Sequence, residues 1–216
     1  MVSPFVGALT APVEGTRHIV SSMSGVGPGA SPDEVFRHAL ESAKNADFRT
    51  ELQVTEIPAP SGLAPFSAAW SATVAPGGRD GEHGISRVVV LYDPVEPDAW
   101  SGPFRMVCFA KAPLDVSMSE DPFLPRVAWS WLMDALDHRA ASFHREAGTS
   151  STIVSTGFGE LASDKVGAEI ELRASWSPKS AELSSHLEAW SEFVCMLAGF
   201  PPLSEGVTPL HSGRLG

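Results

Sequence analysis

The fold of this chain is decided by residues 166–200, VGAEIELRASWSPKSAELSSHLEAWSEFVCMLAGF. From Val166 to Trp176, apolar and polar residues alternate, which is the period of a strand with one buried and one solvated face. After a turn at Ser177-Pro178, apolar residues recur three and four positions apart, which places them on one stripe of a helix that Gly199 can end. The members of this stripe are Leu183, Leu187, Trp190, Val194 and Leu197. Because such a stripe needs an apolar surface to cover, the sequence predicts a helix packed on a sheet.

A helix is also predicted at the start of the domain. Ser31 can cap the backbone, Pro32 suits the first helical position and Glu34 completes a capping box. Four strand patterns follow this helix, at Leu52–Ile57, Phe66–Val74, Arg87–Tyr92 and Phe104–Lys111. Short connections, such as the Gly- and Pro-rich hairpin loop at residues 76–81, predict that consecutive strands are antiparallel neighbours.

Asp121-Pro122 and Pro125 predict the start of a second helix, because proline is tolerated in the first turn of a helix. Apolar residues lie on most of its circumference, which predicts that it is sandwiched between two layers. A strand over Thr149–Phe158 follows and forms a hairpin with Val166–Trp176. The predicted order is therefore α-β-β-β-β-α-β-β-α, an α+β domain in which a mainly antiparallel sheet of about six strands carries three helices on one side.

Length and composition predict one domain. The chain has 216 residues, of which 43% are hydrophobic, enough for a single substantial core. Residues 1–30 are rich in Gly, Ser and Pro and predict a disordered N-terminal tail, residues 31–203 form the domain, and residues 204–216 form a C-terminal tail. No apolar run approaches the ~20 residues of a membrane span and no signal peptide is recognisable, so we expect a cytoplasmic protein without a membrane partner.

The net charge argues against direct binding of nucleic acid. The net charge is −11, and each tail contains one acid and one base, so residues 31–200 carry the whole excess. Direct binding of nucleic acid usually requires a cluster of Lys and Arg, and the sequence contains none. The acidity favours solubility or a basic partner. Cys108 and Cys195 lie in apolar settings and are predicted to be buried thiols.

One group of residues on the second helix has catalytic or metal-binding potential. Asp134, Asp137 and His138 are spaced three and four residues apart, so they could present two carboxylates and an imidazole on one face. The alternative, which we favour, is that these residues form a solvated last turn of the helix, in which His138 interacts favourably with the helix dipole. The chain has no Gly-x-Ser-x-Gly elbow and no phosphate-binding loop in the required context, and His186 is interpreted as a partly buried structural imidazole. We predict no cofactor and do not favour an enzyme.

Aromatic residues suggest a recognition surface. Four of the tryptophans fit core positions: Trp70, Trp129, Trp176 and Trp190. Trp100 falls in a loop, Trp131 lies off the apolar stripe of its helix, and Phe109 points opposite to Met106 and Cys108 in its strand. Since aromatic side chains often anchor interfaces, these three are the candidate partner-binding residues.

Several short blocks carry a resemblance to a known family. They are Glu56-Ile57-Pro58-Ala59-Pro60, Asp121-Pro122-Phe123-Leu124-Pro125, Trp129-Ser130-Trp131-Leu132, Arg173-Ala174-Ser175-Trp176 and His186-Leu187-Glu188-Ala189-Trp190. In this order they resemble an actinobacterial family of unknown function, the domain-of-unknown-function family numbered three thousand, over roughly residues 31–203. The resemblance implies an actinobacterial source and a single domain, and it brings no established activity with it. The element order also resembles small secretion-chaperone-type folds, an analogy of architecture alone.

The hypothesis is thus a non-enzymatic adaptor or chaperone-like domain that binds another protein through its sheet face or its Trp131 helix. The alternative is a small-molecule or metal-dependent enzyme with a pocket near Asp134, Asp137 and His138. A homodimer is a further expectation.

Overall fold

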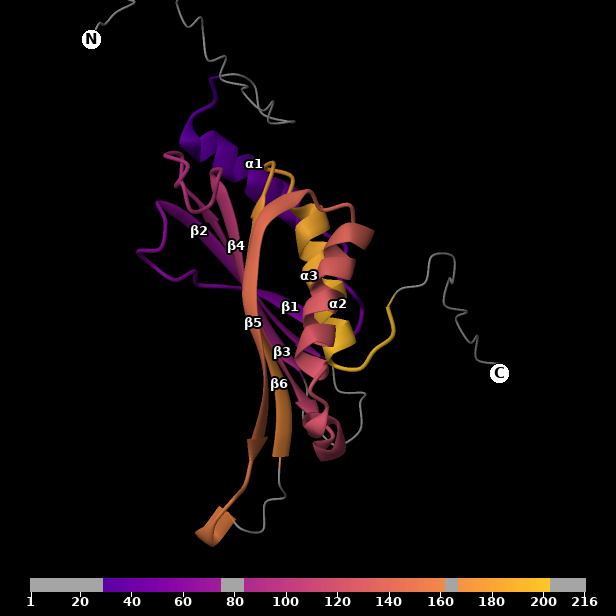
Figure 1. Ribbon diagram of the computed structural model, residues 1–216. Coiled ribbons are helices and arrows are strands. Elements are labelled where there is room, and N and C mark those ends of the chain that lie inside the picture. Colours follow the sequence, from indigo (N-terminus) through magenta and orange to yellow (C-terminus); the bar gives the residue numbers. More distant parts are fainter. Residues whose placement is uncertain (1–28, 75–83, 162–166, 203–216) are drawn as a thin grey trace, which may run out of the picture.

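The computed structural model describes residues 29–74, 84–161 and 167–202. It contains three α-helices, six strands and two short 3₁₀ turns (Figure 1). In chain order they are α1 (Pro32–Lys44), β1 (Leu52–Ile57), β2 (Phe66–Val74), β3 (Ile85–Tyr92), β4 (Phe104–Leu114), η1 (Val116–Glu120), α2 (Leu124–His138), β5 (Phe143–Ser155), η2 (Gly159–Leu161), β6 (Gly167–Pro178) and α3 (Ser184–Leu197). The predicted α+β class and element order are confirmed.

The strands form one antiparallel sheet in the order β1-β2-β3-β4-β6-β5. The first four strands follow one another as a meander. Helix α2 then carries the chain past the position next to β4, so that β5 becomes the edge strand and β6 fills the place between β4 and β5. Helices α2 and α3 lie side by side on one face of the sheet (Figure 1).

Local sequence explains where α1 begins. The Ser31 side chain accepts a hydrogen bond from the Glu34 amide, and the Glu34 carboxylate accepts one from the Ser31 amide. This is the predicted capping box, and Pro32 occupies the first turn. The hydrogen bonds from Ser31 lower the pKa of Glu34. Val35 and Phe36 are buried, and the Phe36 ring stacks on Tyr92, so α1 packs on the same face as the other helices.

The core lies between the sheet and the helices. Its largest fully buried side chains are Trp176, Trp190, Phe104, Phe193, Met106, Leu132 and Leu136. Buried indoles need partners for their N–H groups. Trp190 Nε1 donates to Ser86 Oγ at 2.8 Å, and Trp176 Nε1 donates to Nδ1 of the buried His186 at 3.2 Å. These two bonds tie α3 to the sheet at defined positions.

Strand β5 begins earlier and ends earlier than the sequence pattern predicts. It starts at Phe143 rather than Thr149 and ends at Ser155, and its register shifts between His144 and Ala147. Such a bulge breaks the two-residue period that the prediction depended on. A Cβ at Gly148 would lie 2.5 Å from a backbone oxygen of β6 and 2.5 Å from the Trp129 ring, so glycine is required where α2 crosses β5.

The prediction that α2 is sandwiched between two layers is wrong. Its buried residues are Leu124, Ala128, Leu132, Ala135 and Leu136. Val127 is exposed, and Trp131 and Met133 are partly buried, so one side of α2 faces solvent. The wide apolar stripe arises because α2 contacts both β5 and α3. None of the described helices is long and apolar enough to cross a membrane.

Parts of the prediction fall outside the described residues. They are most of the predicted N-terminal tail, the C-terminal tail at 204–216 and the hairpin loop at 76–81. Both cysteines are buried free thiols, as predicted. Burial raises the pKa of the Cys108 thiol to about 12, and it raises the pKa of Cys195 to a similar value.

Candidate functional site

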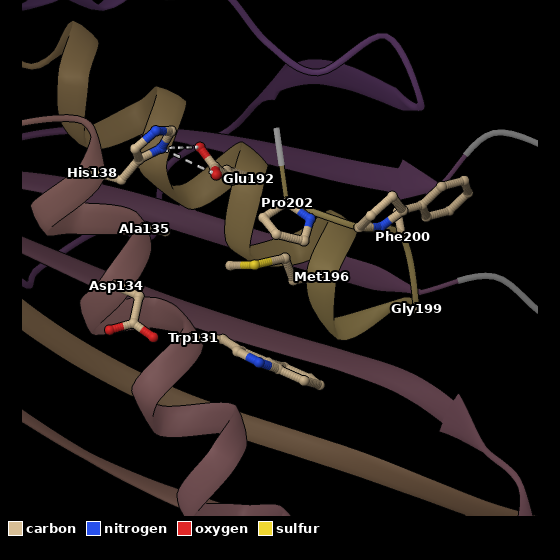
Figure 2. Close-up of a pocket in the computed structure, with 10 residues that line it drawn as sticks. Trp131, Asp134, Ala135, His138, Glu192, Met196, Gly199, Phe200 and Pro202 are labelled. Atoms are coloured by element: carbon tan, nitrogen blue, oxygen red, sulfur yellow. Dashed lines mark hydrogen bonds and ion pairs between the residues drawn. The ribbon is translucent and has the colours of Figure 1, made fainter. Parts of the chain in front are cut away.

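A groove of about 590 Å³ opens between α2, α3 and the segment that follows α3 (Figure 2). Its size lies within the roughly 300–1,000 Å³ typical of ligand pockets. The lining residues are Trp131, Asp134, Ala135, His138, Glu192, Met196, Gly199, Phe200, Pro201 and Pro202. Asp134, His138 and both prolines are exposed, so the groove is a surface feature rather than an enclosed cavity.

Helical periodicity places the side chains along the groove. Trp131, Asp134 and His138 are separated by three and four residues and therefore share one face of α2. Glu192 and Met196, four residues apart, do the same on α3. These two faces form the facing walls of the groove.

The third wall is formed where the chain leaves α3. Gly199 has a φ of +86°, a conformation that favours glycine, and it turns the chain back after the helix. Phe200 then packs against the core, and Arg49 Nη1 donates a hydrogen bond of 3.0 Å to the Pro201 carbonyl. The side chain of Arg49 is buried and also binds Glu51, and this hydrogen bond raises the pKa of Arg49. A fixed cation thus anchors the prolines that close the groove.

One end of the groove is apolar. Figure 2 shows the Trp131 ring, the Met196 thioether and Pro202 around the same space. Trp131 is partly buried and lines the groove, so part of this side chain borders the open space. A partly exposed tryptophan beside a flexible methionine is a surface that can accept an apolar side chain.

The other end is acidic and structured by ion pairs. The Glu192 carboxylate, only 2% exposed, accepts a hydrogen bond of 2.9 Å from Arg139 Nε and lies 3.3 Å from His138 Nδ1. Arg139 also binds Glu188 at 3.2 Å. Within the described ranges Asp134 forms no ion pair, so its exposed carboxylate remains available at the rim.

The predicted metal-binding residues are only partly brought together. Asp134 and His138 line the groove, whereas Asp137 does not. The part of the chain that the structure describes contains no group of three or more His, Cys, Asp or Glu side chains that could hold a metal ion. The His138 imidazole is instead directed to Glu192, with Nδ1 3.3 Å from the carboxylate, so this side chain links α2 to α3.

The other two predicted recognition residues lie elsewhere. Trp100 is partly buried in the loop between β3 and β4, where its carbonyl lies 3.1 Å from His144 Nε2. Phe109 of β4 lies on the sheet face opposite the helices, partly buried beneath the Arg173 guanidinium, whose central carbon is 5.0 Å from the ring centroid. Trp131 and Phe109 therefore mark two separate surfaces.

A family model described as "Protein of unknown function (DUF3000)" matches residues 32–208. The chain belongs to the DUF3000 family. The matched range contains every helix and strand described above, so the groove and the sheet are features of the family domain in this chain. No curated protein and no solved structure matches it significantly.

Several groove residues of this DUF3000 domain are missed by sequence reasoning. The apolar stripe of α3 leaves Glu192 on the side expected to be solvated, yet Arg139 binds it in the interior. Met196 and Phe200 carry no local signal of a groove. The signal available in the sequence is Arg139 at the end of α2, because a guanidinium there can bind a nearby carboxylate as well as interact with the helix dipole.

Proposed function

We propose that this DUF3000 protein is a non-enzymatic protein-binding domain, and that its groove between α2 and α3 holds a short segment of another protein. The observation that carries the proposal is the combination of the partly exposed Trp131 at one end of the groove with the exposed Asp134 carboxylate at the rim, which forms no ion pair among the described residues. Such a surface fits a large apolar side chain followed closely by a Lys or Arg.

Charge complementarity supports this class of partner. The chain has a net charge of −11, and Asp134 is exposed, so a basic segment is attracted both at long range and at the rim. Glu192 already has Arg139 as a partner and therefore contributes the shape of the groove rather than a free charge. A partly buried tryptophan is the residue type that most often dominates such interfaces.

The proposal is tested by selecting peptides from a random display library with the purified protein. We expect enrichment of peptides in which a large apolar residue lies next to a basic one. Trp131→Ala should weaken binding of a selected peptide at least tenfold, and Asp134→Asn should reduce its dependence on salt. The matched control is Val127→Ala, which removes an exposed apolar side chain from the same helix outside the groove. Selected peptides that lack basic residues, or that bind Trp131→Ala unchanged, would contradict the proposal.

The alternative is a small-molecule or metal-dependent enzyme at the same place, and the position of Asp134 and His138 on one wall favours it. A thermal-shift screen of divalent metals and metabolites separates the two: a shift that Asp134→Asn abolishes supports the enzyme. The cytoplasmic location, the actinobacterial source and the homodimer stay predictions from the sequence.

A further inference from the structure

The sheet face opposite the helices has an apolar centre between basic side chains. The strand register places Arg87, Phe109 and Arg173 in one row across β3, β4 and β6. Val89 and Val107 form part of the next row, and Val107 is 38% exposed. An apolar centre with arginines around it has the composition of a protein interface rather than of an ordinary solvated sheet face.

The charge on this face is opposite to that of the whole chain. On β3, β4 and β6 the outward cations are Arg87, Arg105, Lys111 and Arg173, and the outward anions are Glu169 and Glu171. Glu169 binds Lys111, and Glu171 binds Arg173 at 2.7 Å. The central strands thus present a net positive surface on a protein whose net charge is −11.

Arg105 is the most unusual of these cations. Its guanidinium donates to the Arg145 carbonyl at 2.7 Å, to Ser177 Oγ at 3.1 Å and to Ser175 Oγ at 2.6 Å. All three acceptors are neutral, and no carboxylate within the described ranges forms an ion pair with Arg105. Burial lowers the pKa of Arg105, which is the effect expected of a guanidinium without a counterion. Its fixed orientation suits it to binding an incoming carboxylate.

The β1–β2 loop covers only one corner of this face. Ser67 Oγ donates to the Pro60 carbonyl at 3.5 Å, and the adjacent Leu91 and Ala69 are buried although the register directs them outward. The exposed Val107 and the partly exposed Phe109 lie beyond this corner. The accessible area therefore coincides with the positive area.

We propose that this open sheet face binds an acidic segment of a partner protein, with an apolar side chain on Phe109 and Val107 and carboxylates on Arg105 and Arg87. Arg105 and Lys111 are six residues apart along β4, so an extended segment of roughly six to eight residues spans the surface. This site is separate from the groove of the proposed function and has the opposite charge preference.

A peptide fits this face better than a nucleic acid does. The remainder of the chain is acidic and repels a long polyanion, whereas a short segment contacts only the positive area. Phe109 is the one outward aromatic side chain on β3, β4 and β6, so these strands offer a single stacking position rather than a track for successive bases.

Fluorescence anisotropy with three labelled probes tests the proposal. They are an eight-residue peptide with two central leucines and glutamates on both sides, the same peptide with lysines in place of glutamates, and an eight-nucleotide oligothymidine. We expect the glutamate peptide to bind at least tenfold more tightly than the other two. Arg87→Gln and Phe109→Ala should each weaken it several-fold, and both substitutions are at surface positions that do not hold the core together.

The matched control is Arg126→Gln, which removes an exposed arginine from the helix side and should leave binding unchanged. Trp131→Ala should also leave it unchanged, so failure of this proposal is distinguishable from failure of the proposed function. Equal binding of the lysine peptide, tighter binding of the oligonucleotide, or no effect of Arg87→Gln and Phe109→Ala would each overturn the inference.

Discussion

Acidification should destabilise this protein through His186. The imidazole is 1% exposed, and its Nδ1 accepts a hydrogen bond from Trp176 Nε1, so the ring is neutral in the folded state. Burial lowers the pKa of His186 from 6.5 to about 4, although a backbone hydrogen bond with Ser142 favours the charged form. Protonation at Nδ1 would place a charge in the core and remove the acceptor of Trp176.

The magnitude follows from the two pKa values. In the unfolded chain the imidazole binds a proton as the pH falls through 6.5, whereas the folded protein resists protonation until about pH 4. The free energy of unfolding is therefore unaffected above pH 6.5 and falls by about 1.4 kcal/mol for each pH unit below it. Between pH 7 and pH 5 the loss amounts to about 2 kcal/mol, and near pH 4 it approaches about 3 kcal/mol.

Urea unfolding at pH 7 and pH 5 measures this effect. Carboxylates titrate in the same range, so the informative quantity is the difference between wild type and His186→Gln, which can still accept from Trp176 but does not titrate. We expect the variant to lose about 2 kcal/mol less than the wild type between the two pH values. Leu187→Met is the control, because it alters the same buried layer at a cost below about 1.5 kcal/mol and should keep the wild-type pH dependence. An identical pH dependence in wild type and His186→Gln would refute the reasoning.

Three further predictions concern stability and reactivity. Gly148→Ala should destabilise the fold by about 1–3 kcal/mol in thermal unfolding, because its Cβ would overlap backbone and an indole ring, whereas Gly167→Ala, with nothing within 4 Å of the new Cβ, should be nearly neutral. Arg139→Gln should cost about 3 kcal/mol, since it leaves the buried Glu192 without its guanidinium, and adding Glu192→Gln should recover part of the loss; no recovery would contradict the ion-pair explanation. The Cys108 thiol should react with a thiol reagent only after unfolding, and rapid labelling of the native protein would show that burial does not protect it.

The elements themselves follow from local patterns in the sequence. The capping box at Ser31 positions the start of α1, and the two-residue period of β6 assigns Trp176 to the core and Arg173 to the opposite face. Alternation also places Phe109 correctly on the open face. These features are predictable because capping and side-chain direction depend on residues only a few positions apart.

The sites depend on contacts that no local pattern contains. The groove exists because α2 and α3 pack side by side, which buries Glu192 against Arg139, 53 residues away in the chain. The bulge in β5 brings the Arg145 carbonyl to Arg105, 40 residues away, and shifts the strand from its expected start. Periodicity determines which face of each element is apolar, whereas only tertiary packing decides which faces meet, which charges are paired and which side chains remain for a partner.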